Sequence, residues 1–182
     1  DSFTWAEGRI IVDDPAALAE GEDANVVFTF LHARIDQVED ELLLVSPYFV
    51  LRTRGIDKVG ALHGRGVRVR ALTNSLASND VLPVHASYAK TRERLLENGM
   101  EIHELRADTD AFRGNWSFKA GGSRAALHAK ALAFDRDAIF VGSYNLDPRS
   151  GDINTEAGLY IESTELAEEL ADLILDSMAP EN

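Results

Sequence analysis

Short apolar runs that alternate with helix-like segments constrain the fold of this 182-residue chain more than any other feature. The run LLLVS at 42–46 is continuously apolar up to its last residue and is followed by Pro47, which is typical of a strand buried on both faces. Two more strand-like runs follow, each after a segment with helical spacing that ends near a glycine. We expect strands at 42–46, 67–72 and 100–105, and helices at 56–64 and 84–98. Repeated strand–helix–strand units predict right-handed crossovers and a mostly parallel sheet.

The rest of the chain adds elements on either side of this unit. A short edge strand is expected within the first 15 residues, and a turn at 135–137 should join two later strands. Those two strands are expected at 127–134 and 138–141, another strand at 157–161, and helices at 24–40 and 163–178. Residues 107–126 are rich in glycine and lack a period, which is typical of a surface loop. The sequence therefore predicts an α/β fold, a mostly parallel mixed β-sheet flanked by helices, in one domain at 1–182.

Composition excludes several classes of protein. The chain has no cysteine, so disulfides, thiolate chemistry and cysteine-ligated zinc are excluded. No histidine and carboxylate set has the spacing of a metal site, and we expect neither a metal nor another cofactor. No apolar run approaches the roughly 20 residues that span a bilayer. The net charge of −13 opposes nucleic-acid binding, because phosphates are repelled by like charge.

The strongest functional signal is the pattern H-x-K-x4-D-x6-G-S-x-N. It is formed by six residues of one segment, namely His128, Lys130, Asp135, Gly142, Ser143 and Asn145. If each fixed position occurs with a frequency of about 1/20, a chance match in a chain this short is on the order of 10⁻⁵ to 10⁻⁶. A histidine, a lysine and an asparagine that converge are sufficient to cleave a phosphodiester without a metal.

The spacing of these residues indicates a shared anion site. His128 and Lys130 lie two residues apart, so on a strand their side chains point to one face, roughly 6–7 Å apart. Lysine is a point charge suited to phosphate oxygens, and an imidazole can attack or donate a proton near neutral pH. Ser143 and Asn145 could donate to the same phosphate, and Gly142 would allow close approach of the backbone. Glu156, after a further turn, could orient the His128 ring and stabilise its charged form.

The motif resembles the HKD signature of the phospholipase D superfamily, and Glu156 also matches in order. The resemblance implies a phospholipase D-like fold in which two such motifs meet at a pseudo-two-fold axis. One histidine would form a phosphohistidine, and the other would protonate the leaving alcohol. Asp135 would then be a structural hydrogen-bonding residue, and we expect Gly142 to be structural as well. We therefore expect His128, Lys130, Asn145 and Glu156 to be catalytic, with Lys130, Ser143 and Asn145 binding phosphate.

A narrower resemblance covers most of 42–161. The segments SPYF at 46–49, 65–99 and 143–159 resemble the C-terminal half of bacterial cardiolipin synthases. That resemblance implies a phospholipid substrate, peripheral membrane contact in the full-length protein, and a place in the cytoplasm or at the inner membrane of a bacterium. The chain begins at Asp1, not at methionine, and we expect it to be a piece of a longer protein.

The chain departs from the family pattern in carrying a single H-x-K. The other histidines, His32, His63, His85 and His103, have no lysine two residues later. A second motif would come from a missing N-terminal half or from a second copy in a symmetric dimer. The first source is favoured because the narrower resemblance is to a C-terminal half. The fragment alone should then be weakly active or inactive.

Three functions are compatible with these residues. The favoured one is phosphatidyl transfer between phospholipids, and His128 could be its nucleophile or its general acid. The second keeps the reaction but changes the substrate, giving a phospholipase D-type phosphodiesterase or a nuclease, of which the net charge disfavours the nuclease. The third is a non-catalytic half that completes the active site of a partner.

A few residues outside the motif have an open role. His85 could bind phosphate or have a plain surface or capping role, and Arg149 could clamp a phosphate or hold its own loop. Tyr48 and Phe49 are more typical of a core than of a lipid pocket. The aromatic residues and lysine at 116–119 could contact a membrane or pin their loop.

Overall fold

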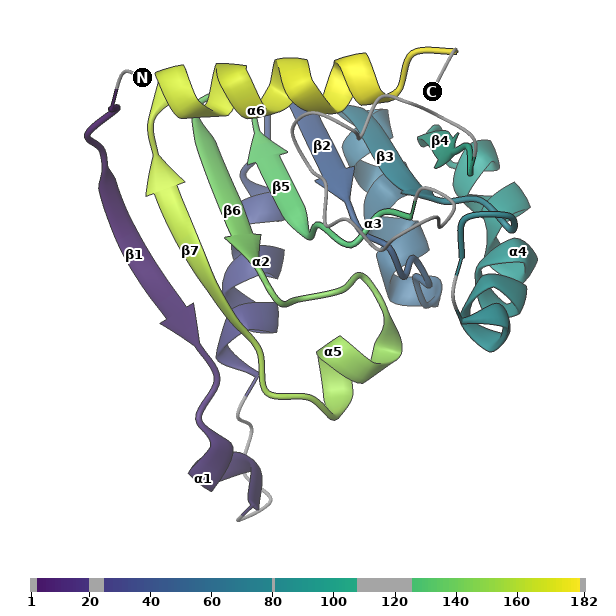
Figure 1. Ribbon diagram of the computed structural model, residues 1–182, viewed down its shortest axis with the longest axis horizontal. Coiled ribbons are helices and arrows are strands. Elements are labelled where there is room, and N and C mark those ends of the chain that lie inside the picture. Colours follow the sequence, from purple (N-terminus) through teal and green to yellow (C-terminus); the bar gives the residue numbers. More distant parts are fainter. Residues whose placement is uncertain (1–2, 20–24, 80, 108–125, 181–182) are drawn as a thin grey trace.

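The computed structural model describes residues 3–19, 25–79, 81–107 and 126–180. Its centre is a seven-stranded sheet with the order β1-β7-β6-β5-β2-β3-β4 (Figure 1). The strands are β1 (Glu7–Val12), β2 (Glu41–Val45), β3 (Arg68–Asn74), β4 (Glu101–Leu105), β5 (Ala131–Phe134), β6 (Ala138–Gly142) and β7 (Ala157–Glu162). The helices are α1 (Pro15–Ala19), α2 (Val26–Asp36), α3 (Thr53–Gly64), α4 (Leu82–Glu97), α5 (Pro148–Asp152) and α6 (Thr164–Ser177).

Helices cover both faces of this sheet. Apolar side chains of α2, α3 and α4 pack with Leu42, Leu44, Leu132 and Phe134 on one face. The other face carries the remaining side chains of the same strands, and α6 crosses it along one edge (Figure 1). Because successive side chains of a strand alternate between faces, β2 and β5 are buried on both sides. The predicted α/β fold, a mixed sheet flanked by helices, is confirmed.

The expectation of a mostly parallel sheet is wrong. Only the β2–β3 and β3–β4 pairs are parallel, and the other four pairs are antiparallel. The parallel pairs are those joined by α3 and α4, as the strand–helix–strand pattern predicted. One of the four antiparallel pairs, β5–β6, follows from the tight turn that joins its strands and forces them to run in opposite directions.

Several boundaries differ from the expected ones. β5 begins at Ala131, four residues after the expected start at 127, so His128 and Lys130 precede the strand. The short helices α1 and α5 were not anticipated, because five residues are too few to show a helical period. Gly99 ends α4 with a φ of +85°, as its position after the helix predicted.

The turn between β5 and β6 is fixed by the side chain of Asp135. Asp135 and Arg136 have φ values of +50° and +57°, the left-handed conformation of a tight hairpin turn. The Asp135 carboxylate accepts hydrogen bonds from the backbone N–H groups of Glu39, Asp40 and Glu41, at 2.8–3.3 Å. Asp135 therefore ties the hairpin to the start of β2, at the edge of the sheet opposite His128.

We predict that Asp135→Asn lowers the free energy of unfolding by about 1–2 kcal/mol, because a neutral amide replaces the charged carboxylate that accepts from three backbone N–H groups. Asparagine tolerates the left-handed conformation, so the backbone should not be strained. Urea unfolding measures the change. The control is Asp137→Asn in the same turn, whose side chain is exposed and should change stability by less than about 0.5 kcal/mol. Equal effects at both positions would contradict the structural role of Asp135.

Candidate active site

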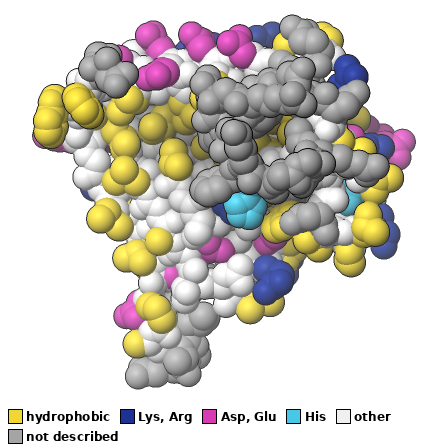
Figure 2. Space-filling model, in the orientation of Figure 1, with side chains coloured by type: hydrophobic (Ala, Val, Ile, Leu, Met, Phe, Trp, Pro, Cys, Tyr) yellow, Lys and Arg dark blue, Asp and Glu magenta, His cyan; other side chains and the backbone are white. Residues whose placement is uncertain are grey.

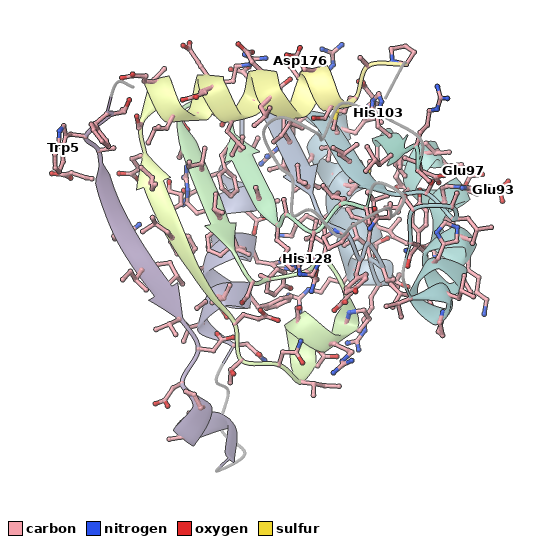
Figure 3. The ribbon with its side chains drawn as sticks, in the orientation of Figure 1. Trp5, Glu93, Glu97, His103, His128 and Asp176 are labelled. Carbon is pink, nitrogen blue, oxygen red and sulfur yellow. The ribbon has the colours of Figure 1, made fainter. Side chains whose placement is uncertain are left out.

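The polarity of the strands brings the motif residues to one edge of the sheet. β2 and β3 end at this edge, and β5, which is antiparallel to β2, begins there. β6 ends at the same edge and β7 begins there. The edge therefore collects His128 and Lys130 before β5, Ser143 and Asn145 after β6, and Glu156 before β7. Figure 3 shows His128 near the start of β5, at the edge of the sheet that lies nearer α5.

His128 and Lys130 approach β5 in an extended segment. The His128 side chain is exposed, whereas Leu127 and Ala129 pack against the core under α6. The Lys130 ammonium group donates to the main-chain oxygen of His128 at 2.9 Å. The Lys130 carbonyl accepts from the N–H of Gly142 at 3.2 Å, which joins this segment to the end of β6. The imidazole is thus open to solvent, and a cationic group lies beside its backbone.

Glu156 is buried and bonded to Ser143. The Ser143 hydroxyl donates to the Glu156 carboxylate and accepts from the N–H of Ala157 at 3.0 Å. Asn154 donates to the other carboxylate oxygen at 3.2 Å. The expected hydrogen bond between the His128 ring and the Glu156 carboxylate is not formed within the described residues, and the carboxylate accepts from Ser143 and Asn154 instead. The hydroxyl hydrogen of Ser143 is directed at Glu156 and so, in this arrangement, is not offered to a phosphate.

Asp13 fixes the backbone next to Glu156. Its carboxylate, 4% exposed, accepts from the N–H of Glu156 at 2.8 Å and from the N–H of Val27 at 2.9 Å. The Asp13 N–H donates in turn to the Glu156 carbonyl at 2.9 Å. One carboxylate therefore joins β1, the start of α2 and the start of β7 behind the site.

Asn145 lies in a loop held by two serine hydroxyls. Its N–H donates to the Ser150 hydroxyl at 3.1 Å, and the next N–H, of Leu146, donates to the Ser46 hydroxyl at 3.1 Å. The Asn145 side-chain oxygen is buried and has no hydrogen-bond partner within the described residues. An unpaired buried acceptor is unfavourable by about 1–3 kcal/mol, so this amide has capacity for a further donor.

Glycine is required where β6 and β7 meet. A Cβ at Gly142 would overlap the Ala157 carbonyl oxygen and lie 2.7 Å from the Cα of Gly158, and a Cβ at Gly158 would overlap the Phe140 ring. The two glycines lie opposite each other in the register. Their close approach places Ser143 within reach of Glu156.

Comparison with known proteins identifies the family of this arrangement. The family described as "Cardiolipin synthase, PLD-like domain" matches residues 31–177. The chain belongs to this PLD-like domain family.

Relatives of the PLD-like domain agree with this assignment. The chain is 39% identical over 173 residues to cardiolipin synthase C of Escherichia coli K12, a match that covers 90% of this chain and 35% of that protein. The chain therefore spans about a third of the length of this curated relative. Its fold is similar to NucT of Helicobacter pylori, with a TM-score of 0.67 and 14% identity, covering 96% of each chain. It is also similar to Nuc of Salmonella typhimurium, a phospholipase D family member, with a TM-score of 0.64 and 15% identity, covering 94% of each chain.

The interior of the PLD-like domain beside the motif is acidic. Tyr144, between Ser143 and Asn145, is 6% exposed. Burial, and then the negative charges of Asp147 and Glu156, raise the pKa of the Tyr144 phenol well above its ordinary value. The phenol therefore remains neutral, and Tyr144 contributes packing under the loop that carries Asn145.

Four buried polar residues of this edge were missed by sequence reasoning, namely Asp13, Ser46, Asn74 and Ser150. Asp13, Ser46 and Asn74 each stand at or just beyond the end of a strand, where polar residues are usually attributed to turns. The sequence signal that could have found them is that all three stand at the ends of strands. The ends of β1, β2 and β3 meet at one edge of the sheet, so polar residues there are brought together.

The residues with an open role have mixed outcomes. Phe49 is 1% exposed and belongs to the core, as expected. His85 is 8% exposed, with its ring 5.5 Å from that of Tyr88, so a surface role is wrong. The Arg149 side chain is exposed, and its carbonyl accepts from the N–H groups of Ile153 and Asn154. Residues 116–119 lie outside the described residues.

Other features do not coincide with the motif. A cavity of about 340 Å³ is lined by residues that include Arg34, Asp137, Tyr160 and Glu162, at the opposite edge of the sheet from His128. Within the described ranges, no three His, Cys, Asp or Glu side chains are grouped so that they could hold a metal ion. Among the helices that the structure describes, none has the length and apolar character that crossing a bilayer requires.

We predict that Gly142→Ala lowers the free energy of unfolding by about 1–3 kcal/mol, because the added methyl group forces β6 away from β7. Thermal or urea unfolding measures this loss. Gly151→Ala is the matched control, since a Cβ there would have its nearest neighbour at 3.6 Å, an ordinary contact. A Gly142→Ala variant as stable as the Gly151→Ala variant would show that the two strands are not in close contact.

Proposed function

We propose that this PLD-like domain is half of an enzyme that transfers phosphatidyl groups between phospholipids, as a cardiolipin synthase does. The observation that carries the proposal is the exposed His128 at the sheet edge that also holds Lys130, Asn145 and Glu156. The 39% identity to a protein named cardiolipin synthase C supports the choice of substrate.

The proposed reaction uses two steps at phosphorus. In one step an imidazole nitrogen forms a bond to phosphorus, the bond from phosphorus to the leaving alcohol breaks, and a second histidine gives that alcohol a proton. In the other step the acceptor alcohol gives its proton to the second histidine and attacks phosphorus, which breaks the P–N bond. Lys130 and Asn145 would stabilise the charge that develops on the phosphate oxygens. His128 serves as either nucleophile or general acid, depending on which half attacks.

Exposed side chains around the site support a lipid substrate over a nucleic acid. Leu76, Leu82 and Ile153 are 60–63% exposed, and they follow β3, start α4 and follow α5, respectively. Apolar groups around a phosphodiester site suit a phospholipid, whose acyl chains lie next to its phosphate. They also support peripheral contact with a bilayer, and the identity to a cardiolipin synthase of Escherichia coli supports a place at the inner membrane of a bacterium. The net charge of −13 disfavours a polyanion.

We propose that a second motif comes from the rest of a longer protein. The structure has an uncovered apolar row on β1, β7 and β6 that supports this: Ile10 lies opposite Leu159, and Leu159 lies opposite Val141. These side chains are 78%, 41% and 44% exposed, and Figure 2 shows hydrophobic side chains over this part of the face. Apolar rows of this kind mark interaction surfaces. The orphaned oxygen of Asn145 also supports a site that other groups complete.

We predict that His128→Ala in the complete protein reduces phosphatidyl transfer by at least about 10³-fold, because the reacting imidazole is removed. Vesicles of phosphatidylglycerol, vesicles of phosphatidylethanolamine and single-stranded DNA are incubated with the protein, and products are identified by mass spectrometry. Loss of phosphatidylglycerol with formation of cardiolipin is the expected result for the unmodified protein.

The control for this variant is His103→Ala, since His103 on β4 lies apart from His128 (Figure 3). This variant should retain its activity. Cardiolipin formation by the His128→Ala variant at the unmodified rate would refute the catalytic proposal. Cleavage of DNA alone would replace the lipid substrate by a nucleic acid.

We predict that Leu159→Lys weakens binding of this domain to the remainder of the complete protein by at least about 10-fold, because docking would bury a charge. The two parts are expressed separately and their affinity is measured by titration calorimetry. The control Leu96→Lys alters a leucine that is 51% exposed on α4 and should not change the affinity. If binding is unaffected by Leu159→Lys, the apolar row is not the contact surface.

A further inference from the structure

Within the part of the chain that the structure describes, the segment at 127–130, which carries His128, has no strand partner along most of its length. The β5 ladder begins at Ala131, which pairs with Val45 on one side and Val141 on the other. Residues 127–130 precede this ladder, yet Leu127 is 3% exposed. Buried N–H and C=O groups without partners are strongly unfavourable, so other groups must bond the backbone here.

The side chain of Asn74 supplies those partners at Leu127. Its amide oxygen accepts from the Leu127 N–H at 2.8 Å, and its amide nitrogen donates to the Leu127 carbonyl at 3.1 Å. Both groups are buried, and Asn74 is 2% exposed. A carboxamide that both donates to and accepts from one residue imitates the paired hydrogen bonds of an antiparallel ladder. The Asn74 side chain therefore takes the place of a strand partner at Leu127, the residue immediately before His128.

The same amide reaches a second segment of the site. Its nitrogen also lies 3.5 Å from the carbonyl oxygen of Pro47. The loop after Pro47 is joined to the loop of Asn145, because Val50 donates to the carbonyl of Leu146 at 2.7 Å. Asn74 thus connects the His128 segment, through Pro47 and Val50, to the loop that carries Asn145.

His128 lies between two fixed points. On one side, Leu127 is bonded to Asn74, and on the other, the Lys130 carbonyl accepts from Gly142. The imidazole itself has no hydrogen-bond partner among the described residues, so the path of its backbone is what directs it. An error of about 1 Å in the placement of a reacting group can reduce a rate by 10²-fold.

We propose that Asn74 is a positioning residue for His128: its buried amide holds the Leu127 backbone so that the next side chain reaches the phosphorus atom. This inference rests on the proposed catalytic role of His128. Asn74 does not touch the substrate, and it acts only through the chain segment that it bonds.

The test compares Asn74→Ala with a matched control in the complete protein. Ser78→Ala removes a buried hydroxyl near the same strand end, which donates to the Leu105 carbonyl at 3.0 Å and not to the His128 segment. We expect Asn74→Ala to reduce kcat for cardiolipin formation by 10- to 100-fold, with KM changed by less than about 2-fold. Ser78→Ala should leave both constants within about 2-fold of the unmodified protein. Thermal unfolding of both variants reports their stability.

Two further variants keep the test decisive. If Asn74→Ala does not fold, Asn74→Asp replaces it, since it is of equal size and keeps the acceptor for the Leu127 N–H but loses both donors. The double variant with His128→Ala shows whether Asn74 acts through His128, in which case adding Asn74→Ala should not reduce the residual rate further.

The outcomes separate this inference from the proposed function. Full activity of His128→Ala overturns the proposed function and, with it, this inference. If His128→Ala is inactive while Asn74→Ala has the kcat of Ser78→Ala, the positioning role alone is overturned. The positioning role is likewise overturned if kcat, KM and thermal stability of Asn74→Ala change in parallel with those of Ser78→Ala.

Discussion

Hydrogen bonding of buried backbone at one edge of the sheet is the constraint on which the rest of the site depends. The ladders stop at this edge while the chain stays buried, so N–H and C=O groups need partners other than strands. Asp13, Ser46, Asn74 and Ser150 provide them for the segments at Glu156, Leu146, Leu127 and Asn145. Short polar side chains lose little conformational entropy when they do this, which keeps the surrounding loops in one arrangement.

This framework leaves the motif residues in two distinct situations. The Glu156 side chain is buried and accepts from Ser143 and Asn154, whereas the His128 side chain is exposed. This difference is compatible with the proposed completion of the site by a second motif.

Strand polarity explains how much could be predicted from the sequence. The α/β fold, the crossovers at α3 and α4, and the gathering of His128, Asn145 and Glu156 follow from apolar periodicity and the motif. The excess of antiparallel pairs was missed because periodicity reports burial and not direction. The contact of Glu156 with Ser143 was missed because side-chain hydrogen bonds depend on a few tenths of an ångström, which the close approach of Gly142 and Gly158 decides.

The four residues that separate Lys130 from Asp135 in the motif are the strand β5. β5 fills the whole interval, with Lys130 bonded to β6 at one end and Asp135 bonded to the start of β2 at the other. Leu132 and Phe134 face one core, and Ala131 and Ala133 face the other. One added residue in β5 would turn the side chains that follow it to the opposite face of the sheet. Large side chains would then enter the core that now holds alanines, and close packing leaves no space for them. The number of residues between Lys130 and Asp135 is therefore fixed by the packing of β5. The same packing determines where His128 and Lys130 lie at the start of the strand.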